Sequence, residues 1–138
     1  MDDGSTSPAV AAVLSTGEVE RLYSGLSVLV STASEGRPAA ALAAFGALDL
    51  LLDPDLLRRA QEPEATPSLS WAGRERFASS LVELRELAFE LEALAVYACS
   101  ASVDTMGLTP ADVEKRFDGV LSTPRFLRQV EGARLLFV

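Results

Sequence analysis

The chain has 138 residues, of which 49% are apolar and 23% charged, and its net charge is −8 at pH 7. This length and composition predict one globular domain, 19–138, and exclude an intrinsically disordered chain. The acidity disfavours nucleic acid as a partner, because a polyanion would be repelled.

The chain contains no histidine and a single cysteine. It therefore cannot form a Ser-His-Asp triad, a Cys-His nucleophile pair or a histidine-ligated metal site. One cysteine cannot close an intramolecular disulfide, and it suits a reducing compartment. We expect no metal and no organic cofactor, since no spacing of carboxylates supports a Mg²⁺ site.

The uncharged stretches 22–34 and 38–48 are shorter than the roughly 20 residues that a membrane-spanning helix needs. The first 16 residues begin with two aspartates and lack the basic start and apolar centre of a secretory signal. We therefore expect a cytoplasmic protein without a membrane partner.

The first third of the chain predicts an extension followed by a strand. Residues 1–18 show no sustained period and are expected to be flexible, with a weak helical turn over 17–23 that Thr16 caps. The apolar run LSVLV, 26–30, predicts a buried parallel strand that ends in the loop 31–37.

The next elements follow from composition. Pro38 and the alanine-rich segment 39–47 predict a helix. The apolar run 48–52 is interpreted as a second strand, and the alternative is that the helix continues. Asp55 to Ala60 predicts a short helix, and the proline-containing segment after it predicts a loop.

The second half of the chain has clearer signals. Apolar residues at spacings of three and four predict an amphipathic helix over 71–90, and the run ALAVYAC, 93–99, predicts a central strand. Thr109-Pro110 and Thr123-Pro124 each predict a capped helix start. A short strand is expected between them, and ARLLFV predicts the last strand after a C-cap at Gly132.

Alternating strands and helices predict a three-layer α/β/α sandwich with a mostly parallel sheet of about five strands. In such sheets, ligands bind outside the carboxyl ends of the strands. Cys99 lies at one of these ends and is the candidate nucleophile. The alternative is a small buried hydrophobe that ends a strand.

Several polar residues are candidates for a pocket or for stabilising an anion near Cys99. Ser100 and Ser102 follow the cysteine directly, and the loop after the predicted first strand would face it if those strands are neighbours. The candidates from that loop are Ser31, Thr32, Ser34 and Arg37. Ser102 stands where a second thiol would be needed, which excludes a thioredoxin-type dithiol mechanism.

The segment 97–109, YACSASVDTMGLT, resembles the DsrE/DsrF-like sulfur-relay family, and the likeness continues through Asp112-Val113 and Asp118-Gly119-Val120 to the last helix and strand. It covers the chain from about Leu26 onward and is weakest over 48–70. The resemblance implies a Rossmann-like homo-oligomer, a trimer or hexamer, that carries a persulfide on Cys99 and exchanges sulfur with donor and acceptor proteins or small thiols.

Two functions remain open from the sequence. The first is a sulfur-relay or thiol-exchange protein. The second is a non-catalytic oligomeric interaction or small-ligand-binding module of the same fold, in which Cys99 is buried and inert. A third and weaker alternative is a peroxide- or disulfide-reducing thiol protein.

Overall fold

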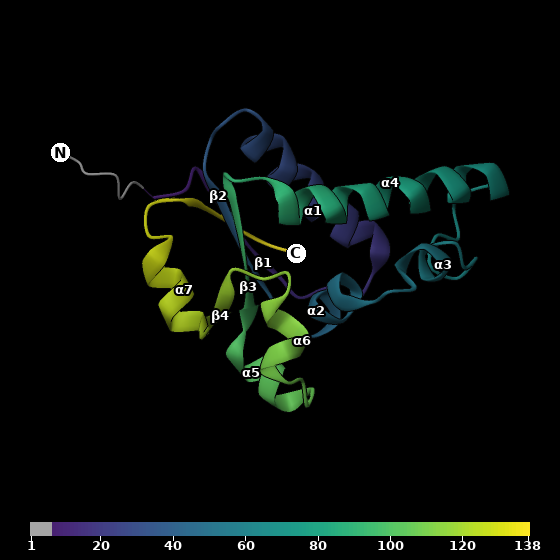
Figure 1. Ribbon diagram of the computed structural model, residues 1–138. Helices are drawn as coiled ribbons and strands as arrows, with labels where there is room; N and C mark the ends of the chain where they lie inside the picture. Colours follow the sequence, from purple (N-terminus) through teal and green to yellow (C-terminus); the bar gives the residue numbers. More distant parts are fainter. Residues whose placement is uncertain (1–6) are drawn as a thin grey trace.

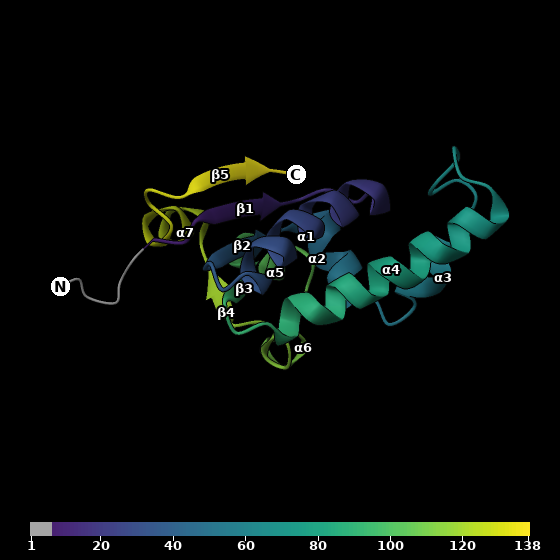
Figure 2. The same cartoon turned by 90° about the horizontal axis from the view of Figure 1, so that it is seen from above.

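A computed structural model describes residues 7–138. Five parallel strands form one sheet in the order β4-β3-β2-β1-β5, and Figure 2 shows them side by side with β5 at one edge. The strands are β1 (Val10–Leu14), β2 (Ala39–Ala43), β3 (Leu94–Cys99), β4 (Gly119–Leu121) and β5 (Arg134–Phe137). The expected three-layer α/β/α sandwich is confirmed, with an entirely parallel sheet.

Seven helices connect the strands and lie on both faces of the sheet (Figure 1). Their bounds are α1 (Val19–Ser34), α2 (Phe45–Leu52), α3 (Leu56–Ala60), α4 (Trp71–Glu90), α5 (Ser100–Thr105), α6 (Pro110–Glu114) and α7 (Thr123–Gln129). Among the helices of residues 7–138, α7 alone covers one side of the sheet, and α1 and α4 cover the other side. We call these two sides the α7 face and the α1 face.

Side-chain alternation along the strands divides the core into two clusters. Along β1, Val10, Ala12 and Leu14 belong to the larger cluster on the α1 face, whereas Ala11 and Val13 belong to the smaller one on the α7 face. The smaller cluster has seven buried members, Ala11, Ala40, Leu42, Ala44, Cys99, Phe126 and Val130. Cys99 is therefore a residue of the α7 face.

The expectation of an N-terminal extension over 1–18 is wrong for the part that the structure describes. Residues Val10–Leu14 form β1, which pairs with both β2 and β5 and is buried on both faces. Thr16 does not cap α1; its hydroxyl accepts the N–H of Glu18 at 3.0 Å, and the helix begins at Val19. Residues 1–6 lie outside the described residues.

Three predicted elements between residues 26 and 52 have the wrong type. Residues 26–30 lie inside α1, and the predicted helix 39–47 is instead strand β2 followed by the start of α2. Residues 48–52 belong to α2, so the helical alternative is correct.

The second half agrees with the sequence. Helix α4 spans Trp71–Glu90, and β3 and β5 lie where strands were predicted. Thr109 caps α6 in a capping box with Asp112, as its spacing predicts. The cap of α7 is Ser122 rather than Thr123, since the Ser122 hydroxyl accepts the N–H of Arg125.

Candidate functional site

Cys99 is the last residue of β3, one of the three inner strands. It pairs with Leu121 of β4, and the preceding Ala98 pairs with Ala43 of β2. The thiol thus lies at the carboxyl edge of the sheet, as predicted. This is the edge at which parallel α/β sheets usually bind ligands.

The Cys99 side chain is only 5% exposed. The other buried members of its cluster are all apolar, and Phe126 of α7, with no exposed surface, is the largest of them. Phe126 also packs edge-on against Tyr97, two residues before the cysteine, with ring centroids 6.4 Å apart. The thiol therefore lies beneath α7 and not in an open cleft.

Four of the predicted pocket residues lie away from Cys99. Ser31, Thr32 and Ser34 belong to the last turns of α1, and Arg37 follows shortly before β2, so all four lie at the amino edge of the sheet. The expectation that they face Cys99 is wrong, because it depended on a strand at 26–30. Their environment is also ordinary: the Thr32 hydroxyl bonds the carbonyl of Val28 at 2.9 Å, and Arg37 forms an exposed pair with Glu35.

The other two candidates do lie beside Cys99. Ser100 begins α5 and is half-buried, whereas Ser102 is completely buried. The Ser102 hydroxyl accepts the backbone N–H of Phe45 at 3.0 Å. Ser102 thereby joins α5 to the start of α2, which is a structural contact.

Phe45 has the unusual backbone angle φ = 45°, the only positive value at a non-glycine residue among the described positions. This conformation costs a residue with a side chain on the order of 1–2 kcal/mol. Phe45 is separated from the end of β2 by Ala44, at the carboxyl edge, and its side chain is 47% exposed. No feature of the sequence indicated this turn, since 39–47 reads as helix.

Gly46, the next residue, lies against the backbone of the loop between β1 and α1. A Cβ atom added at Gly46 would lie 2.7 Å from both the Cα and the N of Gly17, closer than real side chains approach backbone. The β2–α2 turn and the β1–α1 loop therefore touch backbone to backbone. This contact closes the carboxyl edge between β1 and β2.

The same edge carries a cavity of about 500 Å³ on the α1 face. It lies between the first residues of α1 and the loop after α3, and it is lined by Gly17, Glu18, Glu20, Arg59 and Glu62, among others. Cys99 is not among its lining residues. Four of its lining residues are glutamates, Glu64 being the fourth, against one arginine, so the cavity does not provide an anion site for sulfur chemistry.

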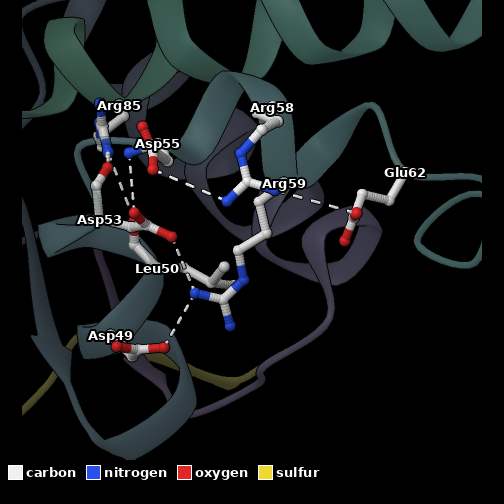
Figure 3. A network of polar contacts seen from close by, with 8 residues as sticks. All are labelled: Asp49, Leu50, Asp53, Asp55, Arg58, Arg59, Glu62 and Arg85. Atoms are coloured by element: carbon white, nitrogen blue, oxygen red, sulfur yellow. Dashed lines mark hydrogen bonds and ion pairs between the residues drawn. The ribbon is translucent and has the colours of Figure 1, made fainter.

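An ionic network beside this cavity was not predicted from the sequence (Figure 3). Arg59 of α3 contacts the carboxylates of Asp49 and Asp53, each at 3.0 Å. The backbone N–H of Asp55 lowers the pKa of Asp53 below its ordinary value against the opposing effect of burial, and Arg59 lowers it further. Helical spacing indicates only the exposed pairs of Arg58 with Asp55 and Glu62, whereas Asp49 and Asp53 reach Arg59 through the fold.

Arg85 of α4 extends the network to the end of α2. Its side chain is 7% exposed, and its Nη1 donates to the carbonyl oxygens of Asp53 at 2.7 Å and Leu50 at 3.4 Å (Figure 3). Both carbonyls lie at the end of α2, and each also accepts one backbone N–H at 3.3 Å, that of Asp53 for Leu50 and that of Leu56 for Asp53. Arg85 therefore caps α2 from another helix, which is a structural task.

A second cavity, of about 360 Å³, lies on the α7 face near the amino edge of the sheet. Tyr97, Arg128 and Glu131 are among its lining residues. Burial raises the pKa of the Tyr97 hydroxyl, and the charge of Asp118 raises it further. Within residues 7–138, no group of three acidic or cysteine side chains converges as a metal site would require.

Comparison with models of known protein families finds no match, and comparison with curated proteins finds none. Among solved structures, the chain is similar to the protein of unknown function MTH1491 from Methanobacterium thermoautotrophicum. The TM-score is 0.53 at 16% sequence identity, and the alignment covers 94% of this chain and 97% of that one. This likeness supports the α/β fold. No helix in the described part of the chain is long and apolar enough to cross a membrane.

Proposed function

We propose that the protein is a non-catalytic interaction module that acts by associating with other chains, with Cys99 as an inert core residue. The observation that carries this proposal is the burial of Cys99, which is 5% exposed in a cluster of apolar residues beneath α7. A buried free cysteine of this kind behaves as a small hydrophobe.

The physical reason for an inert Cys99 is that a reaction partner has no access to its thiol. Thiol exchange requires the attacking sulfur to approach a second sulfur along the line of the bond that breaks, so the nucleophile must reach the surface. Phe126 is wholly buried in the same cluster, and the neighbouring buried side chains are alanine, leucine and valine. Sulfur transfer at Cys99 would require α7 to move away from the sheet.

The second candidate function is a sulfur carrier. The specific observation in its favour is that Cys99 ends an inner strand at the carboxyl edge, directly before α5. The resemblance of 97–109 to the DsrE/DsrF-like family also supports it. In this case Cys99 would accept a sulfur atom from a persulfide donor and pass it to an acceptor, with no metal or organic cofactor.

Alkylation distinguishes the two proposals. The native protein is treated with iodoacetamide across the pH range and analysed by intact mass, with urea-unfolded protein and Cys99→Ser as controls. The interaction module predicts labelling only after unfolding, and no added sulfur after incubation with glutathione persulfide. Rapid native labelling with a midpoint clearly below the free-cysteine value of about 8.5, together with one added sulfur atom, would replace it with the sulfur carrier.

A further inference from the structure

The edge strand β5 leaves one side of its backbone unpaired. The N–H groups of Arg134 and Val138 donate to β1, at Ala9 and Val13. Because backbone groups alternate along a strand, the N–H and C=O groups of Leu135 and Phe137 point away from β1. Neither of these two N–H groups donates a hydrogen bond to an acceptor within residues 7–138.

The side chains of β5 are apolar and exposed on the α7 face. The pairing of Ala11 with Leu135 and of Val13 with Phe137 places both β5 residues on this face. Leu135 is 37% exposed and Phe137 75% exposed. Parallel sheets normally have both faces covered, but here the α7 face is covered by one seven-residue helix.

Edge strands that must stay single usually carry a proline, a bulge or several charges. The run Arg134–Phe137 has none of these apart from Arg134 at its start. The opposite edge strand, β4, has only three residues and contains Gly119 with φ = 154°. The two edges therefore differ, and β5 is the one suited to pairing.

We propose that β5 is a dimerisation edge, at which the β5 strands of two copies of this chain pair antiparallel about a two-fold axis at Leu136. The pairing joins the two sheets into one of ten strands. This inference names the partner of the interaction module proposed above and rests on that proposal. A two-fold axis uses each β5 edge once, so the assembly closes as a dimer.

The register explains the exposed side chains. With Leu136 on the axis, Leu135 lies opposite Phe137 of the second copy as a hydrogen-bonded pair, and the unpaired backbone groups on both strands are satisfied. An axis perpendicular to the sheet keeps the α7 faces of both copies on the same side. Phe137 therefore packs against Leu135 of the second copy, which covers the most exposed aromatic ring of β5.

Charge at the two ends of β5 favours a second copy over an unrelated partner. Glu20 and Phe137 line a common hollow at the carboxyl end of β5, whereas Arg134 stands at its amino end. Neither Glu20 nor Arg134 has an ion-pair partner within residues 7–138, and Arg21, at the same hollow, pairs with Glu18. Antiparallel pairing brings Arg134 of each copy to Glu20 of the other, twice by symmetry.

Sedimentation of the full chain tests the association. A four-residue strand pair is a small interface, so we expect the mass to rise with concentration between about 10 μM and about 1 mM towards twice the 14.6 kDa of one chain. Phe137→Glu should abolish this rise. Trp71→Glu alters a 65% exposed aromatic on α4 and should leave it unchanged. A monomer at the highest concentration, or an assembly whose mass Phe137→Glu does not reduce, overturns the inference.

Charge reversal tests the register. Arg134→Glu places two acidic pairs across the interface and should weaken association about tenfold or more. The double variant Arg134→Glu with Glu20→Arg should restore it, which a merely unfolded variant could not do. If the double variant associates no better than Arg134→Glu alone, the antiparallel register is wrong.

Cross-linking tests the axis, in a Cys99→Ser background. Residues opposite each other at a non-hydrogen-bonded position of an antiparallel pair have Cα atoms about 4.5 Å apart, within disulfide range. Leu136→Cys should therefore form a disulfide dimer when oxidised glutathione accepts the electrons. Leu135→Cys lies off the axis and should cross-link far less, and equal yields would overturn the inference. If the protein stays monomeric and Cys99 does not react in the native protein, the β5 dimer is rejected and the interaction module is retained. If Cys99 reacts in the native protein, the interaction module itself is rejected.

Discussion

The hydroxyl of Ser102 accepts the backbone N–H of Phe45 at 3.0 Å and joins two turns that are 57 positions apart in the chain. Ser102 has no exposed surface, and Phe45 holds the positive φ angle of 45°. The bond therefore holds the strained start of α2 against α5 at the carboxyl edge of the sheet.

Ser102→Ala removes this bond and leaves the N–H of Phe45 without a partner. We expect the free energy of unfolding to fall by about 1–2 kcal/mol, measured by urea denaturation. Ser100→Ala is the matched control, because the Ser100 side chain makes no hydrogen bond within the described residues; its effect should stay within about 0.5 kcal/mol. Equal effects from both variants would show that the bond contributes nothing.

Gly46→Ala should destabilise the protein by about 2 kcal/mol or more, since the new Cβ would lie 2.7 Å from the backbone of Gly17. Gly17→Ala is the reciprocal control: its Cβ would meet Gly46 at 3.7 Å, an ordinary contact. Thermal unfolding of both variants gives the comparison. A Gly46→Ala protein as stable as Gly17→Ala would show that the two turns separate easily.

Arg85→Met keeps the length of the side chain but removes the donor that caps α2. We expect a loss of about 1–2 kcal/mol, because the carbonyl oxygens of Leu50 and Asp53 lose the Arg85 donor and each keeps one backbone N–H. Arg58→Met, at a side chain that is 68% exposed, should cost less than about 0.5 kcal/mol. Urea denaturation checks both values.

Acid should weaken the fold through Asp53 and Glu86. Partial burial alone would raise the pKa of Glu86, but the hydrogen bonds and charges of Arg116 and Arg85 outweigh it and lower the pKa, and the pKa of Asp53 is lowered as well. A carboxylate with a lowered folded pKa stabilises the protein fully above its ordinary value of about 4 and loses that contribution as the pH falls through the folded value.

Urea denaturation between about pH 2 and pH 6 tests this sign. The free energy of unfolding should fall as the pH decreases, and Asp53→Asn or Glu86→Gln should flatten the dependence. Glu62→Gln, at a carboxylate that is 54% exposed and 4.0 Å from Arg58, serves as the control and should keep the slope of the parent. A slope unchanged by the first two variants would contradict the prediction.

Phe126 controls access to Cys99. Phe126→Ala should cost about 3–5 kcal/mol and open the cluster beneath α7, so that iodoacetamide labels Cys99 in the folded protein. The rate at which iodoacetamide labels Cys99 in Phe126→Leu should lie between the rates in Phe126→Ala and in the parent protein. Phe77→Ala removes a ring that packs against Tyr23 on the α1 face and should destabilise the protein without native labelling. Circular dichroism confirms that each variant is folded during the reaction.

The sequence predicted the second half of the fold because local signals and packing agree there. The spacing within 71–90, the Thr109-Pro110 cap and the apolar run before Cys99 each produced the element that they indicate. The position of Cys99 at the carboxyl edge followed from that run. The burial of Cys99 did not follow from that run, because it depends on α7 packing over the face of the sheet that carries Cys99.

The first half misled because packing overrides propensity. Alanine favours helices, yet Ala39–Ala43 is buried along its whole length between β1 and β3 as a strand. The run 26–30 looks continuous, but Leu26, Leu29 and Val30 are buried while Val28 is 41% exposed, which is a helical pattern. With both elements reversed, the predicted polar pocket came to lie at the wrong edge of the sheet.

The pairing of β1 with β5 also bears on the order of folding. Val10 pairs with Arg134, so the first and last strands of the sheet meet only when nearly the whole chain is available. During synthesis, β1 through β4 can assemble while the β1 edge is still bare, and that edge is exposed to other nascent chains until β5 emerges from the ribosome. Closing a loop of this length also slows folding, so β5 should dock last.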